Sequence, residues 1–284
     1  MMRKKQIYVS LSVMLFILLI LYGYTKYTDI FPSTDDAYVQ ANTVNIAPQV
    51  SGPVKSIYAY DHQFVSRGQL LFEIDPNPFE IAVEKAQANF KQTQAELSTQ
   101  QKDTARTLSL VKQGQAPKSE GDDAQGKLDQ LTAALKVAKS TLDGAQLDLE
   151  HTHIYAPADG NLTNFVLRVG QVVQSGAYLF ALVENKQFWV DANFKETDLN
   201  RVKPGQSAKI KIDMHPDVIF QGIVQGISAG SGAIFSVLPP ENATGNWVKV
   251  TQRFPVRVNI INPDPKYPLR AGSSCEVTID TREQ

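Results

Sequence analysis

The chain has 284 residues, and its 28 basic and 29 acidic residues give a formal net charge of −1. This length suffices for one large or two modest domains, and 43% hydrophobic residues exclude a disordered chain. The balanced charge offers no general attraction for nucleic acid, so no nucleic-acid partner is expected. The single cysteine excludes an intramolecular disulfide.

An uncharged apolar segment, residues 7–24, follows a basic tail at residues 1–6. Its length suits a helix that crosses a membrane, and basic residues are retained on the cytoplasmic side. We therefore predict a single-pass anchor in contact with membrane lipid, with a cytoplasmic N-terminus and an exported bulk. The alternative is a cleaved signal peptide, which the long apolar run and the missing small-residue cleavage pattern disfavour. Residues 25–43 are expected to be a linker.

Two segments, Gly52–Asp75 and Gly160–Val183, align without a gap, and Gly68 coincides with Gly176. Each has apolar residues near strand spacing around a turn glycine, which predicts a short β-hairpin with one buried face. Residues 44–75 and 152–186 are therefore expected to form the two halves of one sandwich. This pattern resembles a split lipoyl or biotinyl carrier domain. Because no lysine is presented after Asp75, we expect no carrier chemistry and no cofactor.

Residues 76–151 change to helical spacing, and residues three and four apart form a seam along two arms. The seam residues are Phe79, Val83, Ala86, Phe90, Thr93, Leu97, Gln100, Thr104, Leu108 and Val111 on the first arm and Leu128, Leu131, Leu135, Ala138, Leu142, Ala145 and Leu149 on the second. This spacing is the seam of an antiparallel coiled-coil hairpin, with Gly114, Pro117 and Gly121 placed where the chain must turn. The alternative is an ordinary helical pair packed on the β modules, but the narrow seam favours a projecting hairpin. Polar seam residues Gln100 and Thr104 are expected to weaken the pairing towards the tip.

Residues 187–284 are predicted to form a small β-barrel. Val202–Asp213 aligns with Leu269–Asp280, which brings Gly205 together with Gly272 as turn glycines. That alignment predicts that Cys275 lies opposite Ala208 and packs inward, without a role as a nucleophile. Strand-like segments at 188–194, 218–227 and 248–261 complete the barrel.

No catalytic or metal-binding motif stands out. His151 and His153 lack a third ligand nearby, and the chain contains neither a phosphate-binding glycine loop with lysine nor a nucleophile elbow. We therefore expect neither enzymatic activity nor a metal site. Residues 226–245 resemble a long loop, and loops of this kind often carry contacts. Phe235 and Trp247 either face a partner there or act as local packing anchors.

The order of these modules, together with four short motifs, resembles the HlyD/EmrA family of membrane fusion proteins, which are periplasmic adaptors. The fold class implied is mainly β with an α-helical hairpin: an N-terminal transmembrane helix, a split lipoyl-like domain, the inserted hairpin and a C-terminal β-barrel. The motifs are Asp35–Val39, Ala47–Gly52, Tyr155–Gly160 and Leu238–Trp247, and the last, which contains Asn246, resembles the EmrA branch.

The resemblance implies a bacterial inner-membrane adaptor with its bulk in the periplasm. It would join an inner-membrane exporter of the major-facilitator type to a TolC-like outer-membrane channel, and self-associate into a ring, a trimer or a hexamer. The exporter or a neighbouring subunit would contact the barrel loop at Phe235, Asn246 and Trp247. The implied function is efflux of drugs or toxic compounds. An adaptor of a type I or other secretion system, and an envelope scaffold without a transport role, remain as alternatives.

Adaptors of this superfamily that dock on TolC carry an arginine at the hairpin tip, a leucine four residues later and a serine seven beyond that. Here Arg106 and Leu110 match, but Pro117 stands in the serine position and Ser119 lies two residues further on. Arg106 would donate to carbonyls or carboxylates of a channel helix and Leu110 would fill a groove. The alternative is that all four residues are simply solvated. The glycines expected to be structural are Gly52, Gly68, Gly160, Gly176, Gly205 and Gly272.

Overall fold

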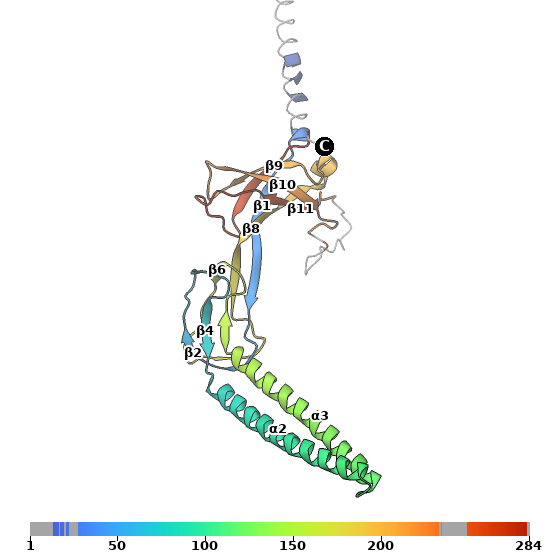
Figure 1. The fold of residues 1–284 in the computed structure, drawn as a ribbon. Coiled ribbons are helices and arrows are strands. Elements are labelled where there is room, and N and C mark those ends of the chain that lie inside the picture. The colour runs from blue at the N-terminus through green and yellow to red at the C-terminus, as the bar shows by residue number, and fades with distance from the viewer. Residues whose placement is uncertain are drawn as a thin grey trace, which may run out of the picture. The chain divides into compact units, whose positions relative to one another are not determined.

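The computed structural model describes residues 14–16, 18, 19, 21, 22, 28–232, 234 and 249–282. The chain divides into two compact units, the first made of Met1–Asn42 and Val183–Gln284 and the second of Thr43–Leu182 (Figure 1). Most of the predicted anchor at 7–24 lies outside the described residues. Within the described part, no helix combines the length and the apolar character needed to cross a membrane.

The first unit is a β-barrel. Its strands follow the order β1 (Ser33–Ile46), β12 (Ser274–Ile279), β9 (Ser207–Ile212), β10 (Ile219–Ile227), β11 (Arg253–Ile260) and β8 (Phe180–Lys195). β8 also pairs with β1, and this pairing closes the barrel. A short 3-10 helix, η1 (Glu196–Arg201), follows β8. The residues of alternate positions point inward and form one apolar core.

The segment expected to be a linker, residues 25–43, largely forms a strand. β1 begins at Ser33 and buries Thr34; after a register shift its buried positions alternate through Ala37, Val39 and Ala41. The barrel lacks a closing strand without it, because β8 and β12 would each keep an unpaired edge. The prediction missed β1 because its inward residues are mostly small, so the alternation carries little hydrophobic signal.

Cys275 is buried, as predicted, but its strand partner is different. It pairs with Ile212, whereas Ala208 pairs with Ile279. The aligned repeats lie antiparallel to each other, so a residue of one repeat does not face its equivalent in the other. Cys275 faces Ile212, and Ala208, the equivalent of Cys275, faces Ile279, the equivalent of Ile212. Burial raises the pKa of the Cys275 thiol to about 12, which removes the thiolate at neutral pH.

The second unit contains the sandwich. One sheet has the order β5 (His153–Tyr155), β4 (Leu70–Ile74), β2 (Gly52–Ile57) and β7 (Val172–Val173). The facing layer is formed by β3 (Phe64–Val65), β6 (Gly160–Thr163) and the start of β8. The two layers enclose an apolar core centred on Phe72 and Phe180, whose rings meet edge to face at 6.1 Å.

Each aligned half keeps a strand pair of its own, β2 with β4 and β6 with β8, and the two halves also pair with each other. Gly52 of the first half pairs with Val173 of the second, and Val65 pairs with Gly160. These two pairs are equivalent under the repeat alignment, so the sandwich has an internal pseudo-two-fold symmetry. The short strands bury one face only when both halves combine, which explains why the repeat occurs twice.

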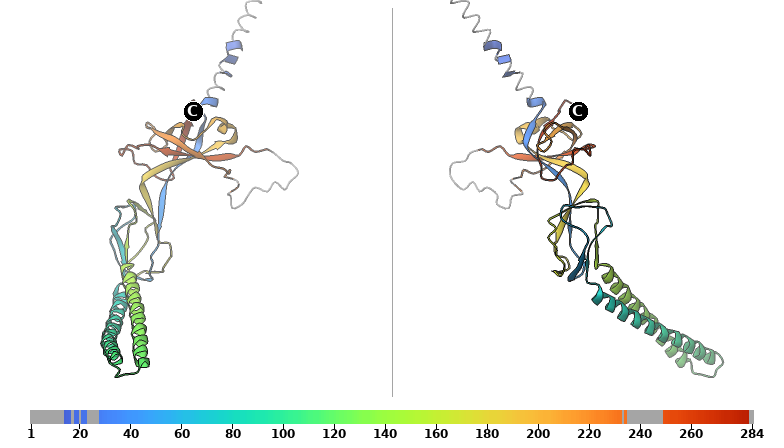
Figure 2. Two further views of the ribbon diagram at one scale, coloured as in Figure 1. Left: turned by 45° about the vertical axis from the view of Figure 1, so that its right-hand side comes forward. Right: turned by 90° about the vertical axis from the view of Figure 1, so that its left-hand side faces the viewer.

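The helical hairpin consists of α2 (Asn77–Lys112) and α3 (Lys118–Glu150), which lie side by side (Figures 1 and 2). α2 follows β4 directly and α3 leads into β5. The residues at the predicted seam are the buried or half-buried ones of each helix. Among the described residues of the two helices, the buried apolar side chains are those of Ala86, Leu97, Ala138 and Leu142, so most of the hairpin surface is polar.

Two details of the hairpin differ from the prediction. Gly121 lies inside α3, not in the turn, where it gives room to Leu108 and Val111 of α2: a Cβ atom there would meet their side chains at 3.3 and 3.4 Å. Thr104 joins the helices, because its Oγ1 donates to the carbonyl of Ala124 at 3.1 Å and accepts from Gln100 at 3.2 Å. The polar seam is therefore a satisfied interhelical link.

Candidate functional site

The hairpin ends in a tight, well-defined turn. Gly114 adopts φ +67°, and the N–H of Gln115 donates to the carbonyl of Leu110 at 2.9 Å while that of Gly114 donates to Val111 at 3.1 Å. This pair of bonds is the Schellman arrangement that ends many helices. Glycine adopts a positive φ without strain because it has no Cβ atom. The tip residues are therefore held on a firm support.

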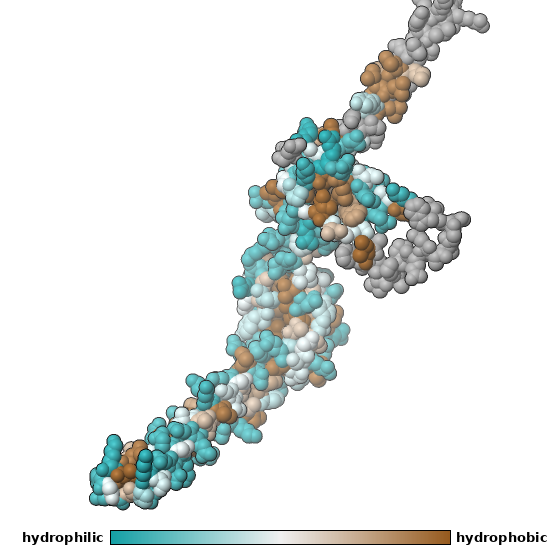
Figure 3. All heavy atoms as spheres, turned by 90° about the vertical axis from the view of Figure 1, so that its right-hand side faces the viewer, coloured by the Kyte–Doolittle hydropathy of each residue, from teal (hydrophilic) through white to brown (hydrophobic). Residues whose placement is uncertain are grey.

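Arg106 and Leu110 both present their side chains to solvent near this turn. Arg106 is 76% exposed and its Nη1 lies 3.1 Å from the Asp103 carboxylate one turn earlier. Leu110, in the last turn of α2, is 43% exposed. Most of the hairpin surface in view is hydrophilic, with one apolar patch at its loop end (Figure 3). Elsewhere on the two helices the exposed apolar side chains include Ile81, Val137 and Leu147. The tip therefore combines one cation with an apolar contact surface.

Pro117 and Ser119 lie just across the turn from these residues. Pro117 has φ −66° and ψ 149° and immediately precedes α3. Ser119 lies in the first turn of α3 and is exposed. The four predicted tip residues thus come together at one end of the hairpin. Phe235, Asn246 and Trp247, the predicted contacts of the barrel loop, lie outside the described residues.

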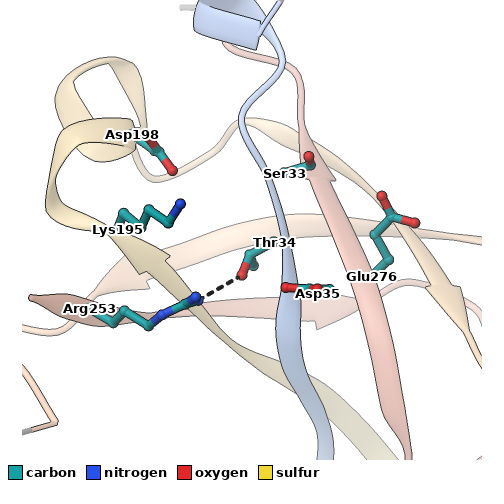
Figure 4. Close-up of a pocket in the computed structure, with 7 residues that line it drawn as sticks. All are labelled: Ser33, Thr34, Asp35, Lys195, Asp198, Arg253 and Glu276. Carbon is teal, nitrogen blue, oxygen red and sulfur yellow. Dashed lines mark hydrogen bonds between the residues drawn. The ribbon is translucent and has the colours of Figure 1, made fainter. Parts of the chain in front are cut away.

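A polar pocket of about 260 Å³ opens on the barrel (Figure 4). Arg253 anchors one side: its Nη1 donates to the carbonyl of Asn193 at 3.0 Å and lies 3.3 Å from the Asp36 carboxylate. The pocket is lined by Ser33, Thr34, Asp35, Lys195, Asp198, Arg253 and Glu276. Three carboxylates and one ammonium group thus line the pocket in addition to the anchored Arg253. A pocket with this lining suits a polar or charged surface of a partner.

Asp35 and Asp36, which open the motif Asp35–Val39, lie in different surroundings on β1. β1 turns Asp35 outward beside Glu276 of β12, whereas Asp36 accepts from the side chain of Asn193 at 3.2 Å. A signal was present, because two consecutive acids open a segment with alternating Ala37, Val39 and Ala41. That alternation indicates a strand with Asp36 on its polar face, whereas Asp35 points outward because the pairing register shifts between Thr34 and Ala37.

A second pocket, of about 380 Å³, lies on the sandwich and is lined by residues 44–49, 150, 151, 153–155 and 157. We call it the β5 groove. His151 and His153 both line it, and His153 stacks on Tyr155 with the ring centroids 6.5 Å apart. The described residues contain no group of three or more His, Cys, Asp or Glu side chains arranged to hold a metal ion.

A charged cluster lies on the four-stranded sheet of the sandwich. Glu73 accepts from Lys55 Nζ at 3.0 Å and from the Tyr58 hydroxyl at 3.1 Å. These bonds hold the pKa of the Glu73 carboxyl below its ordinary value and raise the pKa of Lys55. The cluster joins β2 to β4 and stabilises the pairing of these two strands.

The glycines predicted to be structural occupy positions that demand glycine for two different reasons. Gly68 and Gly176 adopt φ +80° and +77° at equivalent turns of the sandwich, and Gly205 and Gly272 adopt φ +93° and +88° at equivalent turns of the barrel. Gly52 instead lies so close to Ile74 that a Cβ atom would approach its Cγ2 to 2.7 Å. Gly160 is buried at the start of β6.

Two family profiles cover almost all of this architecture. A profile described as "RND MFP, barrel-sandwich hybrid domain" matches residues 42–185, and one described as "AAEA-like beta-barrel domain" matches residues 187–280. The first range contains the sandwich with its helical hairpin, and the second contains most of the barrel strands.

Curated relatives and solved structures agree with this match. The chain is 34% identical to the fatty acid resistance protein FarA of Neisseria gonorrhoeae, over 87% of this chain and 75% of that protein. It is 32% identical to the multidrug export protein EmrA of Haemophilus influenzae, over 98% of this chain and 84% of that protein. The membrane fusion protein Spr0693 of Streptococcus pneumoniae R6 has a similar fold, with a TM-score of 0.65, 16% identity and coverage of 88% and 98%.

A sandwich with an inserted helical hairpin, followed by most of the strands of a β-barrel, defines a membrane fusion protein. The chain belongs to this family, in the branch that contains the EmrA-like proteins.

Proposed function

We propose that this chain is a non-catalytic periplasmic adaptor of an efflux pump. It joins an inner-membrane exporter of the major-facilitator type to a TolC-like outer-membrane channel and assembles as a ring of three or six copies. Residues 7–24 anchor it in the inner membrane and the rest lies in the periplasm. The observation that carries the proposal is the exposed Arg106 and Leu110 at the tip of a long, mostly hydrophilic hairpin, in a chain whose relatives include a multidrug export protein.

The chemistry of the tip supports docking on a channel helix. Arg106 provides a guanidinium that is 76% exposed, able to exchange its contact with Asp103 for a carbonyl or carboxylate of the channel. Leu110 offers an apolar side chain to a groove between helices. Because the Schellman turn holds both residues on a firm helix end, little ordering is needed on binding.

The barrel supports contact with the exporter. Asp35, Lys195, Asp198 and Glu276 line a polar pocket next to the chain that leads from the predicted anchor. Charged surfaces of this kind favour specific, reversible protein contacts at the membrane side. Phe235, Asn246 and Trp247 of the loop after β10 are proposed as further contacts.

The test is cross-linking in living cells from a photoreactive residue placed at Arg106 and, in a second strain, at Trp247. We expect an outer-membrane channel to be trapped from position 106 and an exporter from position 247. In parallel, deletion of the chain should abolish efflux while the exporter remains folded in the membrane. Undiminished efflux in the deletion strain would refute the function, and only self-links at both positions would favour an envelope scaffold.

Tip variants separate docking from folding. Arg106→Ala and Leu110→Ala should lower efflux, whereas Val137→Ala, at an exposed position in the middle of α3, should leave it unchanged. Pro117→Ser completes the family's tip motif and places a good N-cap before α3. We expect it to keep the hairpin intact and to increase trapping of the channel from a photoreactive residue at position 106. Equal loss of efflux in Val137→Ala would contradict a role specific to the tip.

A further inference from the structure

The four-stranded sheet of the sandwich ends in two unpaired strands. β5 pairs only with β4 and β7 only with β2 among the described residues, so they form the two opposite edges of this sheet. Unpaired strand edges invite association with other chains unless they are covered. The two edges also differ in character, because one borders a groove and the other carries exposed valines.

The edge at β7 carries an exposed apolar segment, residues 166–172, which we call the valine turn. Val166, Val169 and Val172 are 76%, 64% and 69% exposed. The segment is nevertheless held firmly: the N–H of Gly170 donates to the Val54 carbonyl, and the N–H of Val54 donates to the Gln171 carbonyl, both at 2.8 Å. The valines are therefore presented to solvent in a fixed arrangement.

The internal repeat distinguishes Val169 from the two other valines. The equivalent turn of the first half carries Tyr58, Asp61 and Phe64 at the positions of Val166, Val169 and Val172. Tyr58 and Phe64 are themselves 51% and 53% exposed. Asp61 differs from Val169, because its Oδ1 accepts from the backbone N–H of Phe165 in the other half at 3.1 Å. Val169 thus extends the exposed apolar surface of the second half where the first half has a hydrogen-bonded carboxylate, and clustered exposed apolar residues mark contact surfaces.

The β5 groove at the other edge has a complementary character. Its apolar lining includes Val44, Ile46 and Ile154. Glu150, the last residue of α3, is exposed at its rim, and Arg168 is exposed in the valine turn. Neither side chain forms an ion pair within the described part of the chain. One edge therefore offers valines with a cation, and the other a partly apolar groove with an anion.

We propose that the valine turn of one copy docks in the β5 groove of a second copy, with Arg168 against Glu150. Because the two surfaces differ and lie at opposite edges of the same sheet, every copy uses both, and the association is head to tail. Head-to-tail contacts close into rings when the rotation allows. The inference rests on the ring of the proposed function and names the surfaces that build it.

The test uses cysteine pairs in the full-length chain in native membranes. Val169→Cys combined with Asn45→Cys, in the groove, should give a ladder of cross-linked species beyond the dimer with a short bismaleimide. The matched control is Asp61→Cys with Asn45→Cys, since Asp61 is the equivalent position of the other half. Each single-cysteine variant shows whether the buried Cys275 takes part in any cross-link. A missing ladder, a ladder as strong in the control, or a dimer alone would overturn the proposal.

Charge reversal gives a second, independent measurement. Arg168→Glu and Glu150→Arg should each reduce the cross-linking yield several-fold, and the double variant should restore it, since the pair is then reversed. Both residues are exposed, so the fold is retained. Efflux is measured in the same strains. Efflux that needs the chain, without a ladder, would refute the interface alone, and a ladder in a chain dispensable for efflux would refute the proposed function alone.

Discussion

At the start of β2, Gly52 leaves the space that the side chain of Ile74 occupies, with only 2.7 Å between Ile74 Cγ2 and the position of an added Cβ. Ile74 is completely buried and cannot move aside freely. We expect Gly52→Ala to lower the free energy of unfolding by about 1–3 kcal/mol, as overpacking usually does. Chemical denaturation of the two proteins measures the difference.

A matched control is available in α3. Gly126 has no atom near the position of an added Cβ, and it lies within a helix. Gly126→Ala should therefore raise stability by roughly 0.5–1 kcal/mol through helix propensity. If Gly52→Ala were as well tolerated as Gly126→Ala, the close contact with Ile74 would not be a constraint.

The bonds from Lys55 and Tyr58 hold the pKa of Glu73 below 4.5, its ordinary value. A carboxyl whose pKa is lowered by folding stabilises the folded state above its unfolded pKa, and this contribution disappears as the pH falls through the folded pKa. The melting temperature of the native protein should therefore fall more steeply between about pH 6 and about pH 2 than that of Glu73→Gln. Parallel curves for the two proteins would contradict this assignment.

At the scale of the secondary-structure elements, α2 and α3 share a seam whose polar position is satisfied across the pair. Thr104 is buried, and its hydroxyl donates to the Ala124 carbonyl. Thr104→Val keeps the shape but loses this bond, so we expect the hairpin to lose about 1 kcal/mol. Thr104→Ser retains the donor and should keep most of the bond. Hydrogen exchange of the amides of α2 and α3 measures both, and equal protection in the valine variant would show that the bond is energetically neutral.

In the two β modules, the aligned repeats of the sequence become strands that pair with each other. Each aligned repeat pairs with its counterpart and is related to it by a pseudo-two-fold axis, as Gly52 with Val173 and Val65 with Gly160 show. The two aligned repeats of the barrel pair in the same way, because Ala208 pairs with Ile279 and Cys275 pairs with Ile212. An alignment identifies equivalent positions but not neighbours, since antiparallel pairing brings non-equivalent positions together.

At the scale of the whole molecule, the two units have separate apolar cores that share no buried residue. Ile210 lies in the barrel core and Leu71 in the sandwich core, and both are completely buried. Ile210→Ala and Leu71→Ala should each cost about 2–5 kcal/mol through lost burial and the cavity left behind. Hydrogen exchange should show the loss of protection concentrated in the unit that carries the substitution. Equal loss in both units from either variant would show that they unfold as one.

Much of the architecture could be predicted from the sequence, because its signals are local. The seam of the hairpin follows from a period that any helix must obey, and Leu97, Ala138 and Leu142 are buried at predicted seam positions. The turn glycines follow from equivalent positions in aligned repeats, where only glycine meets a positive φ at little cost. The tip residues Arg106 and Leu110 follow from a motif of fixed spacing on a single helix.

What only the tertiary structure decided are relations between segments distant in the chain. β1 is a strand because β8 and β12, far away in sequence, need a partner, and small residues such as Ala37 and Ala41 suffice to fill its inward face. Gly121 belongs to α3 because Leu108 and Val111 pack over it. The sequence by itself determined the periods, turns and repeats, since these depend on near neighbours. Strand partners, pockets and the two unlike edges of the sandwich depend on which distant segments exclude water together.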